Sequence, residues 1–144
     1  KSANMSVGIN LLLKLLKEAA PVLSEAGFDI EIVACPIKRE ADGLALSSRN
    51  VRLTPGQRAV APAIHRILAE SVDGASGRSV DEVKHAVTDA INAVDGMEVE
   101  YYEIVNPADM QPIAEWSEAE GGAVGCVTVY MGDVRLIDNI KYPA

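Results

Sequence analysis

Hydrophobic residues recur at helical spacing in the first quarter of the chain, with charged residues between them. This pattern predicts a helix over residues 9–25, with Ser6 or Asn10 as its N-cap and Gly27 as its stop. Residues 29–34 (DIEIVA) alternate and then become apolar, which predicts a strand. A helix followed by a strand is the arrangement of an α/β unit. The apolar face of the helix comprises Leu12, Leu15, Leu16, Ala19 and Val22.

Two further helices are predicted over residues 54–71 and 79–94, separated by a Gly- and Ser-containing linker at 73–77. Each begins with a hydroxyl residue followed three positions later by Gln or Glu, which is the pattern of a capping box. Pro55 at the first turn supports the first of these starts. The two capping pairs are Thr54–Gln57 and Ser79–Glu82.

The last third of the chain is rich in β-forming residues. It predicts strands over residues 97–105, 123–131 and 134–139, the last two joined by a tight turn at Gly132 and Asp133. The expected fold class is α+β: helices packed on a small antiparallel sheet, preceded by the helix–strand α/β unit.

Composition and charge narrow the class of protein. The chain has 144 residues, 49% of them hydrophobic, which is enough for one domain with a real core. Thirteen basic and 21 acidic residues give a net charge of −8, which disfavours nucleic acid and anionic lipid as partners. No apolar run approaches the roughly 18 residues of a membrane span. The first residues lack the pattern of a signal peptide, so a cytoplasmic location is expected.

The cysteines and histidines give no sign of a metal site. Cys35 and Cys126 lie far apart, and buried free thiols are expected rather than a disulfide. His65 and His85 fall on predicted helices, where surface or half-buried positions are expected. Zinc is therefore not expected.

The loop at residues 36–54 breaks the periodic pattern and is the best candidate for function. Its basic side chains and its two adjacent hydroxyls, Ser47 and Ser48, are of the types that bind the oxygens of a triphosphate. The alternative is a surface loop with an Arg–Asp pair and serine-capped turns. The basic residues within 38–50 are Lys38, Arg39 and Arg49.

Residues 35–50 (CPIKREADGLALSSRN) resemble the signature of the pantothenate synthetase (pantoate–β-alanine ligase) family. The resemblance extends over about residues 32–141. Further similar segments are LTPGQR at 53–58, VEYYEIVNP at 99–107 and GDVRLIDN at 132–139. The domain expected from this resemblance covers residues 34–144 and corresponds to the family's C-terminal lid.

The resemblance implies a chemistry for this loop. The family condenses pantoate with β-alanine in an AMP-forming reaction that uses ATP and Mg²⁺ and passes through pantoyl adenylate. Ser47, Ser48 and Arg49 match its ATP-phosphate loop, and Lys38 and Leu46 match positions beside the adenine and ribose. Mg²⁺ would arrive with the nucleotide rather than bind a protein cage.

Other family motifs are missing, above all the His-x-Gly-His motif of the N-terminal nucleotide-binding domain. Independent ligase activity is therefore not expected. Residues 1–33 instead resemble a segment of dihydrodipicolinate reductase, through SANMSVGINLLLKLL at 2–16 and DIEIV at 29–33. This implies a chimera, with a plain helix N-terminus as the alternative reading of residues 4–10.

Two functions remain open at this point. The first is an ATP-binding lid domain with at most weak affinity for the nucleotide by itself. The second is a structural module that forms homo-oligomers through the apolar run at residues 11–16. Three smaller expectations concern other residues. Glu98, Glu100 and Glu103 should face solvent without basic partners, Asp138 and Asn139 should be strand-end structure rather than a ligand contact, and Trp116 should be a core or lid-packing residue.

Overall fold

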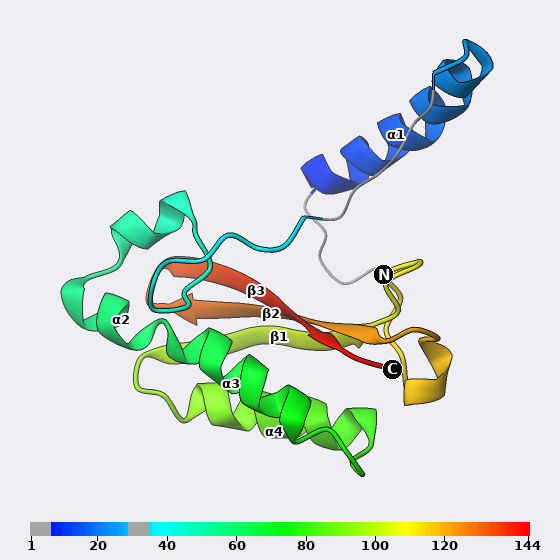
Figure 1. Cartoon of the computed structure of the whole chain (residues 1–144). Coiled ribbons are helices and arrows are strands. Elements are labelled where there is room, and N and C mark those ends of the chain that lie inside the picture. The colour runs from blue at the N-terminus through cyan, green and yellow to red at the C-terminus, as the bar shows by residue number, and fades with distance from the viewer. Residues whose placement is uncertain (1–6, 29–34) are drawn as a thin grey trace. The chain divides into compact units, whose positions relative to one another are not determined.

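The computed structural model describes residues 7–28 and 35–144 of the chain (Figure 1). The chain divides into two compact units, Lys1–Pro36 and Ile37–Ala144. The strand expected at 29–34 and the candidate cap Ser6 lie outside the described residues. No helix of the described part is long and apolar enough to cross a membrane.

The first unit contains one long helix, α1 (Val7–Glu25). Asn10 lies inside this helix, so its predicted role as the N-cap is wrong. The predicted stop at Gly27 is confirmed: Gly27 has φ +85°, and its N–H donates to the Ser24 carbonyl at 3.0 Å. The N–H of Phe28 donates to the Leu23 carbonyl at 3.0 Å. These two bonds form a Schellman motif, which needs a left-handed residue after the helix.

The second unit is built on a three-stranded antiparallel sheet in the order β1 (Met97–Val105), β2 (Ala123–Met131), β3 (Val134–Tyr142). The bounds of β1 and β2 are as predicted, and Gly132 makes the predicted two-residue turn with φ +58°. Strand β3 is longer than predicted, since residues 140–142 continue to pair with β2.

The helices of this unit begin as predicted, but the first one is broken. Both capping boxes are present. The helix predicted over residues 54–71 is instead two helices, α2 (Pro55–Val60) and α3 (Ala63–Asp73). Pro62 lies between them, where it has no N–H to donate and its ring obstructs the preceding turn. The following helix, α4 (Val80–Asn92), ends two residues earlier than predicted.

The helices pack against the sheet, which confirms the α+β class (Figure 1). Helix α3 lies against β3, α4 lies against β1, and the two helices contact each other. Alternate residues of each strand therefore face the helices and are buried. The centre of this core is formed by apolar residues that are at most 2% exposed, among them Ile64, Leu68, Val80, Ile91, Ile104, Val127, Val129 and Met131.

A chain of hydroxyl groups crosses this core. The Ser71 hydroxyl donates to the Leu68 carbonyl at 2.6 Å, so its bond with the Tyr142 hydroxyl, also 2.6 Å, must be one that it accepts. The Tyr142 hydroxyl therefore donates its only proton to Ser71, and it accepts a hydrogen bond from the Tyr102 hydroxyl at 2.6 Å. Burial raises the pKa of both tyrosines, which keeps both hydroxyls protonated.

The two cysteines differ in burial, and Trp116 packs against the core of the second unit. Cys35 is exposed, so its predicted burial is wrong. Cys126 is half-buried in β2, and burial raises the pKa of its thiol. Trp116 begins the short 3₁₀ helix η2 (Trp116–Glu118) and packs against the core as predicted.

Gly125→Ala should lower the free energy of unfolding by about 1–3 kcal/mol, the usual cost of overpacking a core. A Cβ at Gly125 would overlap the Tyr102 hydroxyl and approach a Tyr142 ring carbon to 3.0 Å. Urea unfolding measures the change. Gly56→Ala is the control, because a Cβ there meets nothing within 4 Å and should change stability by less than about 1 kcal/mol. Equal stability of the two variants would contradict the proposed packing.

Candidate functional site

The candidate loop is ordered by a short hairpin. Arg39 and Ala45 form an antiparallel bridge, and the Leu46 N–H donates to the Lys38 carbonyl at 2.9 Å. Gly43 closes the turn with φ +92°, a conformation that disfavours side chains. A Cβ at Gly43 would also come within 3.1 Å of the His65 ring. The turn therefore requires glycine both for its backbone conformation and for its contact with α3.

The hairpin leads directly into a 3₁₀ helix, η1 (Ser48–Arg52). Ser47 caps it, since its hydroxyl accepts the Arg49 N–H at 3.2 Å. Arg49 and Arg52 are three residues apart, so in a 3₁₀ helix they lie on the same side. Arg52 was not among the residues predicted for the site. Its spacing from Arg49 is visible in the sequence, but it places the two side chains together only because the segment is a 3₁₀ helix.

All five predicted nucleotide-binding residues lie on one continuous segment of the loop. Lys38 and Leu46 are paired through their backbones, and both are exposed, Leu46 at 59%. Ser47, Ser48 and Arg49 follow immediately, and the last two are exposed. Within the part of the chain that the structure describes, Lys38 and Arg49 form no ion pair. Their positive charges therefore remain available to an anion.

Arg39 differs from Lys38 and Arg49, because it is engaged in an ion pair. Its guanidinium donates two hydrogen bonds to the Asp138 carboxylate, at 2.7 and 3.0 Å. The Asp138 side chain is only 3% exposed and lies on β3. The predicted alternative was a surface loop with an Arg–Asp pair and serine-capped turns. Ser47 does cap a turn, but Arg39 pairs with a buried aspartate of β3 rather than with one of the loop.

His65 of α3 lies beside this pair. Its Nδ1 is 3.9 Å from Asp138 Oδ2, is buried, and has no hydrogen-bond partner among the described residues. Burial lowers the pKa of His65, the nearby Arg39 charge lowers it further, and Asp138 opposes both effects. The imidazole is therefore held neutral, which leaves Arg39 as the cation that balances Asp138.

A second, more exposed network holds the outer side of the loop. The Asn50 amide donates to Glu40 at 2.8 Å and to the Ala45 carbonyl at 3.1 Å. Arg58 of α2 donates to Glu40 at 2.8 Å and to Asp42 at 2.6 Å. The Asn50 bond and then Arg58 lower the pKa of Glu40, and Arg58 lowers that of Asp42. The two carboxylates therefore stay ionised and share the single positive charge of Arg58 rather than that of Lys38 or Arg49.

Two expectations about acidic residues are corrected by the sheet. Glu100 accepts from Arg135 at 2.6 Å, and Glu103 pairs with Lys84 of α4 at 2.8 Å, so neither lacks a basic partner. The register that brings Glu100 to Arg135 includes a β-bulge between Val99 and Tyr101. Across residues 7–28 and 35–144, no group of three or more His, Cys, Asp or Glu is placed to hold a metal ion.

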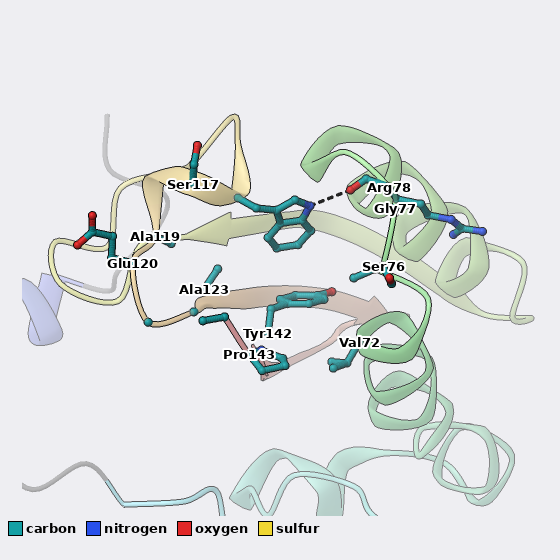
Figure 2. A pocket seen from close by; sticks show the side chains of 15 residues that line it. Val72, Ser76, Gly77, Arg78, Ser117, Ala119, Glu120, Ala123, Tyr142 and Pro143 are labelled. Carbon is teal, nitrogen blue, oxygen red and sulfur yellow. Dashed lines mark hydrogen bonds between the residues drawn. The ribbon is translucent and has the colours of Figure 1, made fainter.

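A separate pocket of about 710 Å³ lies between η2, the end of β3 and the linker after α3 (Figure 2). Its walls are mainly apolar, with Trp116 and Tyr142 side by side at a ring distance of 5.2 Å. The Trp116 N–H donates to the Arg78 carbonyl at 2.8 Å, and the Tyr142 hydroxyl belongs to the buried chain described above. These polar groups are already satisfied, and none of the predicted site residues lines the pocket.

Comparison with known proteins identifies the family. The Pantoate-beta-alanine ligase family model matches residues 19–141. The chain belongs to this family. Pantothenate synthetase from Porphyromonas gingivalis (strain W83) is 53% identical over 116 residues, which is 81% of this chain but 41% of that protein. The enzyme from Bacteroides fragilis (strain YCH46) is 51% identical over 80% of this chain and 40% of its own.

Solved structures agree with the sequence matches. Pantothenate synthetase from Thermus thermophilus superposes with a TM-score of 0.71 at 37% identity, over 87% of this chain and 45% of that one. Pantoate-beta-alanine ligase from Francisella tularensis was solved with Beta-gamma ATP and Beta-alanine. It gives a TM-score of 0.54 at 25% identity, over 93% of this chain and 39% of that one. The chain thus spans about two fifths of the length of these family members.

The family match bears on the chimera hypothesis for part of the first segment. The matched range starts at residue 19, so residues 19–33 belong to the match with the Pantoate-beta-alanine ligase family, and residues 1–18 lie before it. The comparisons give that assignment no support. The helix pattern of residues 9–25 is common to many α/β proteins, so it could not specify one family.

The neutral state of His65 predicts a pH dependence of stability. Its folded-state pKa lies below the unfolded value of 6.5, so the folded state binds fewer protons. The stability linked to His65 is therefore fully present above pH 6.5 and is lost as the pH falls through the folded pKa. Urea unfolding at several pH values from 7.5 downward gives the slope of the free energy of unfolding against pH. This slope should be smaller in His65→Gln than in the wild type. His85→Gln controls for loss of a histidine as such, and an unchanged slope in His65→Gln would refute the assignment.

Proposed function

We propose that this chain supplies the ATP-phosphate loop and lid of a pantothenate synthetase. The observation that carries the proposal is the exposed segment formed by Lys38, Leu46 and 47–49, held on an anchored hairpin and lying within the family match. The relative from Francisella tularensis was solved with an ATP analogue, which supports a nucleotide as the ligand of this family.

The proposed chemistry assigns each group a role. The Arg49 guanidinium offers a fork of donors to phosphate oxygens, and Ser47 and Ser48 add hydroxyl donors. Such donors stabilise the charge that develops on the leaving pyrophosphate when an adenylate forms. Lys38 and Leu46 flank the adenine and ribose. The described residues offer no cage for Mg²⁺, so the ion would bind with the triphosphate.

We propose that condensation of pantoate with β-alanine requires residues beyond these 144. The chain corresponds to about two fifths of its relatives, and its sequence has no His-x-Gly-His motif. A lid contributes by closing over a site and excluding water, and it needs the rest of the site to act. The role proposed for this chain is therefore to bind and enclose the nucleotide rather than to complete the ligation.

An amide NMR titration with Mg·ATP tests this function. Shifts should gather at residues 38–50, and Arg49→Ala should weaken binding about tenfold or more, because a charge-assisted hydrogen bond contributes about 1.5–3 kcal/mol. Arg66→Ala removes an exposed arginine of α3 and is the matched control. Absence of loop shifts at millimolar ATP would overturn the proposal.

A second candidate function is self-association through α1. Several apolar side chains of this helix and the residue after its stop are exposed, and those at i, i+1, i+7 and i+8 share one face. An apolar stripe of this kind favours contact with a second copy of the chain. The exposed residues are Leu15, Leu16, Val22, Leu23 and Phe28.

Light scattering after size exclusion tests this second function. The wild type should show a mass above 15.3 kDa that rises with concentration, and Leu15→Glu/Val22→Glu should be monomeric. Val51→Glu/Ile137→Glu removes two exposed apolar residues of the other unit and should behave as the wild type. A monomeric wild type at all concentrations would exclude self-association.

A further inference from the structure

Asp138 is an acidic residue on the apolar face of the sheet. It is paired in register with Val127, which is 1% exposed, and it follows Leu136 on the same face. A carboxylate in such a position is costly unless it is paired and hydrogen-bonded. Arg39, 99 residues away in sequence, supplies that pairing.

The Arg39 guanidinium connects the loop to β3 at several points. Besides its two bonds to Asp138, it donates to the Gly43 carbonyl at 3.2 Å and to the Asn139 carbonyl at 3.4 Å. The Asn139 N–H in turn donates to Asp138 Oδ1 at 2.7 Å. The hairpin turn and the edge strand are therefore joined through one side chain.

Arg39 lies in the hairpin directly beside the predicted site residues. It follows Lys38, whose carbonyl accepts the Leu46 N–H, and it forms a bridge with Ala45. Ser47, the cap of η1, follows Leu46 along the chain. Any displacement of Arg39 therefore moves both sides of the segment that carries the five predicted residues.

We propose that Asp138 is a positioning residue for the phosphate loop: through Arg39 it holds residues 38–49 in the arrangement that receives the nucleotide. The inference rests on the function proposed above and adds a residue that touches no nucleotide. Its effect is preorganisation, in which a larger population of the binding-competent loop gives a tighter apparent affinity.

The outer network is a weaker anchor than Asp138. Glu40 and Asp42 are 30% and 42% exposed in their side chains, against 3% for Asp138. Exposed ion pairs contribute little, because water screens them. Asp138 is therefore the residue whose loss should release the loop while the Arg58 contacts remain.

The test compares Asp138→Asn and the double variant Arg39→Met/Asp138→Leu with the wild type. The double variant replaces the ion pair with apolar groups, a change that buried pairs often tolerate without loss of stability, so it covers the case in which Asp138→Asn fails to fold. Glu100→Gln is the matched control, since it removes an ion pair to β3 that does not touch the loop. Amide hydrogen exchange, urea unfolding and the Kd for Mg·ATP are measured for each.

In the folded variants, the Leu46 and Asn50 amides should exchange faster while those of β2 keep their protection. If the competent population falls to about one tenth, the Kd for Mg·ATP rises about tenfold. Glu100→Gln should change neither. Unchanged loop exchange, or an unchanged Kd in a folded variant, would overturn the positioning role. A wild type that binds no ATP would instead overturn the proposed function, and the inference with it, even if the loop is released.

Discussion

The bidentate ion pair between Arg39 and Asp138 is the interaction on which the candidate site depends. It joins the loop to β3, the edge strand that packs against α3. Because the Asp138 carboxylate is buried, loss of Arg39 would leave that charge unpaired, which is costly and favours the paired position of the loop. Gly43 has no Cβ, which allows the hairpin turn to lie close to the His65 ring beside this ion pair.

The same pair bears on the proposed binding of a polyanion by an acidic chain. The net charge is −8, yet the three carboxylates nearest the loop are each bound to an arginine or an amide. Arg58 pairs with both Glu40 and Asp42, Asn50 donates a hydrogen bond to Glu40, and Arg39 pairs with Asp138. Among the described basic residues of the loop, Lys38, Arg49 and Arg52 are exposed and form no ion pair. Local pairing therefore matters more here than the total charge.

Features with local signals were predictable from the sequence. The capping boxes, the Gly132 turn and the alternation of β1 and β2 each depend on residues within a few positions of one another. The break at Pro62 also had a local signal, which the apolar periodicity on either side obscured.

Pairings between distant residues were not predictable. Sequence showed that Arg39 and Asp138 have opposite charges, but their contact depends on the packing of β3 beneath the loop. The partner of Glu100 depends on a β-bulge, and the burial of His65 on the break between α2 and α3. For the five predicted site residues, the sequence supplied the residue types and the family resemblance, and the hairpin supplied their proximity.

A crystal structure of this chain with Mg²⁺ and a non-hydrolysable β,γ-ATP analogue is the most direct test. The expected result is a triphosphate in contact with Ser47, Ser48 and Arg49, with the Arg39–Asp138 bonds still near 2.7 and 3.0 Å. A triphosphate bound elsewhere on the chain, or a loop that binds it only after Arg39 has left Asp138, would contradict a site that is preformed by this ion pair.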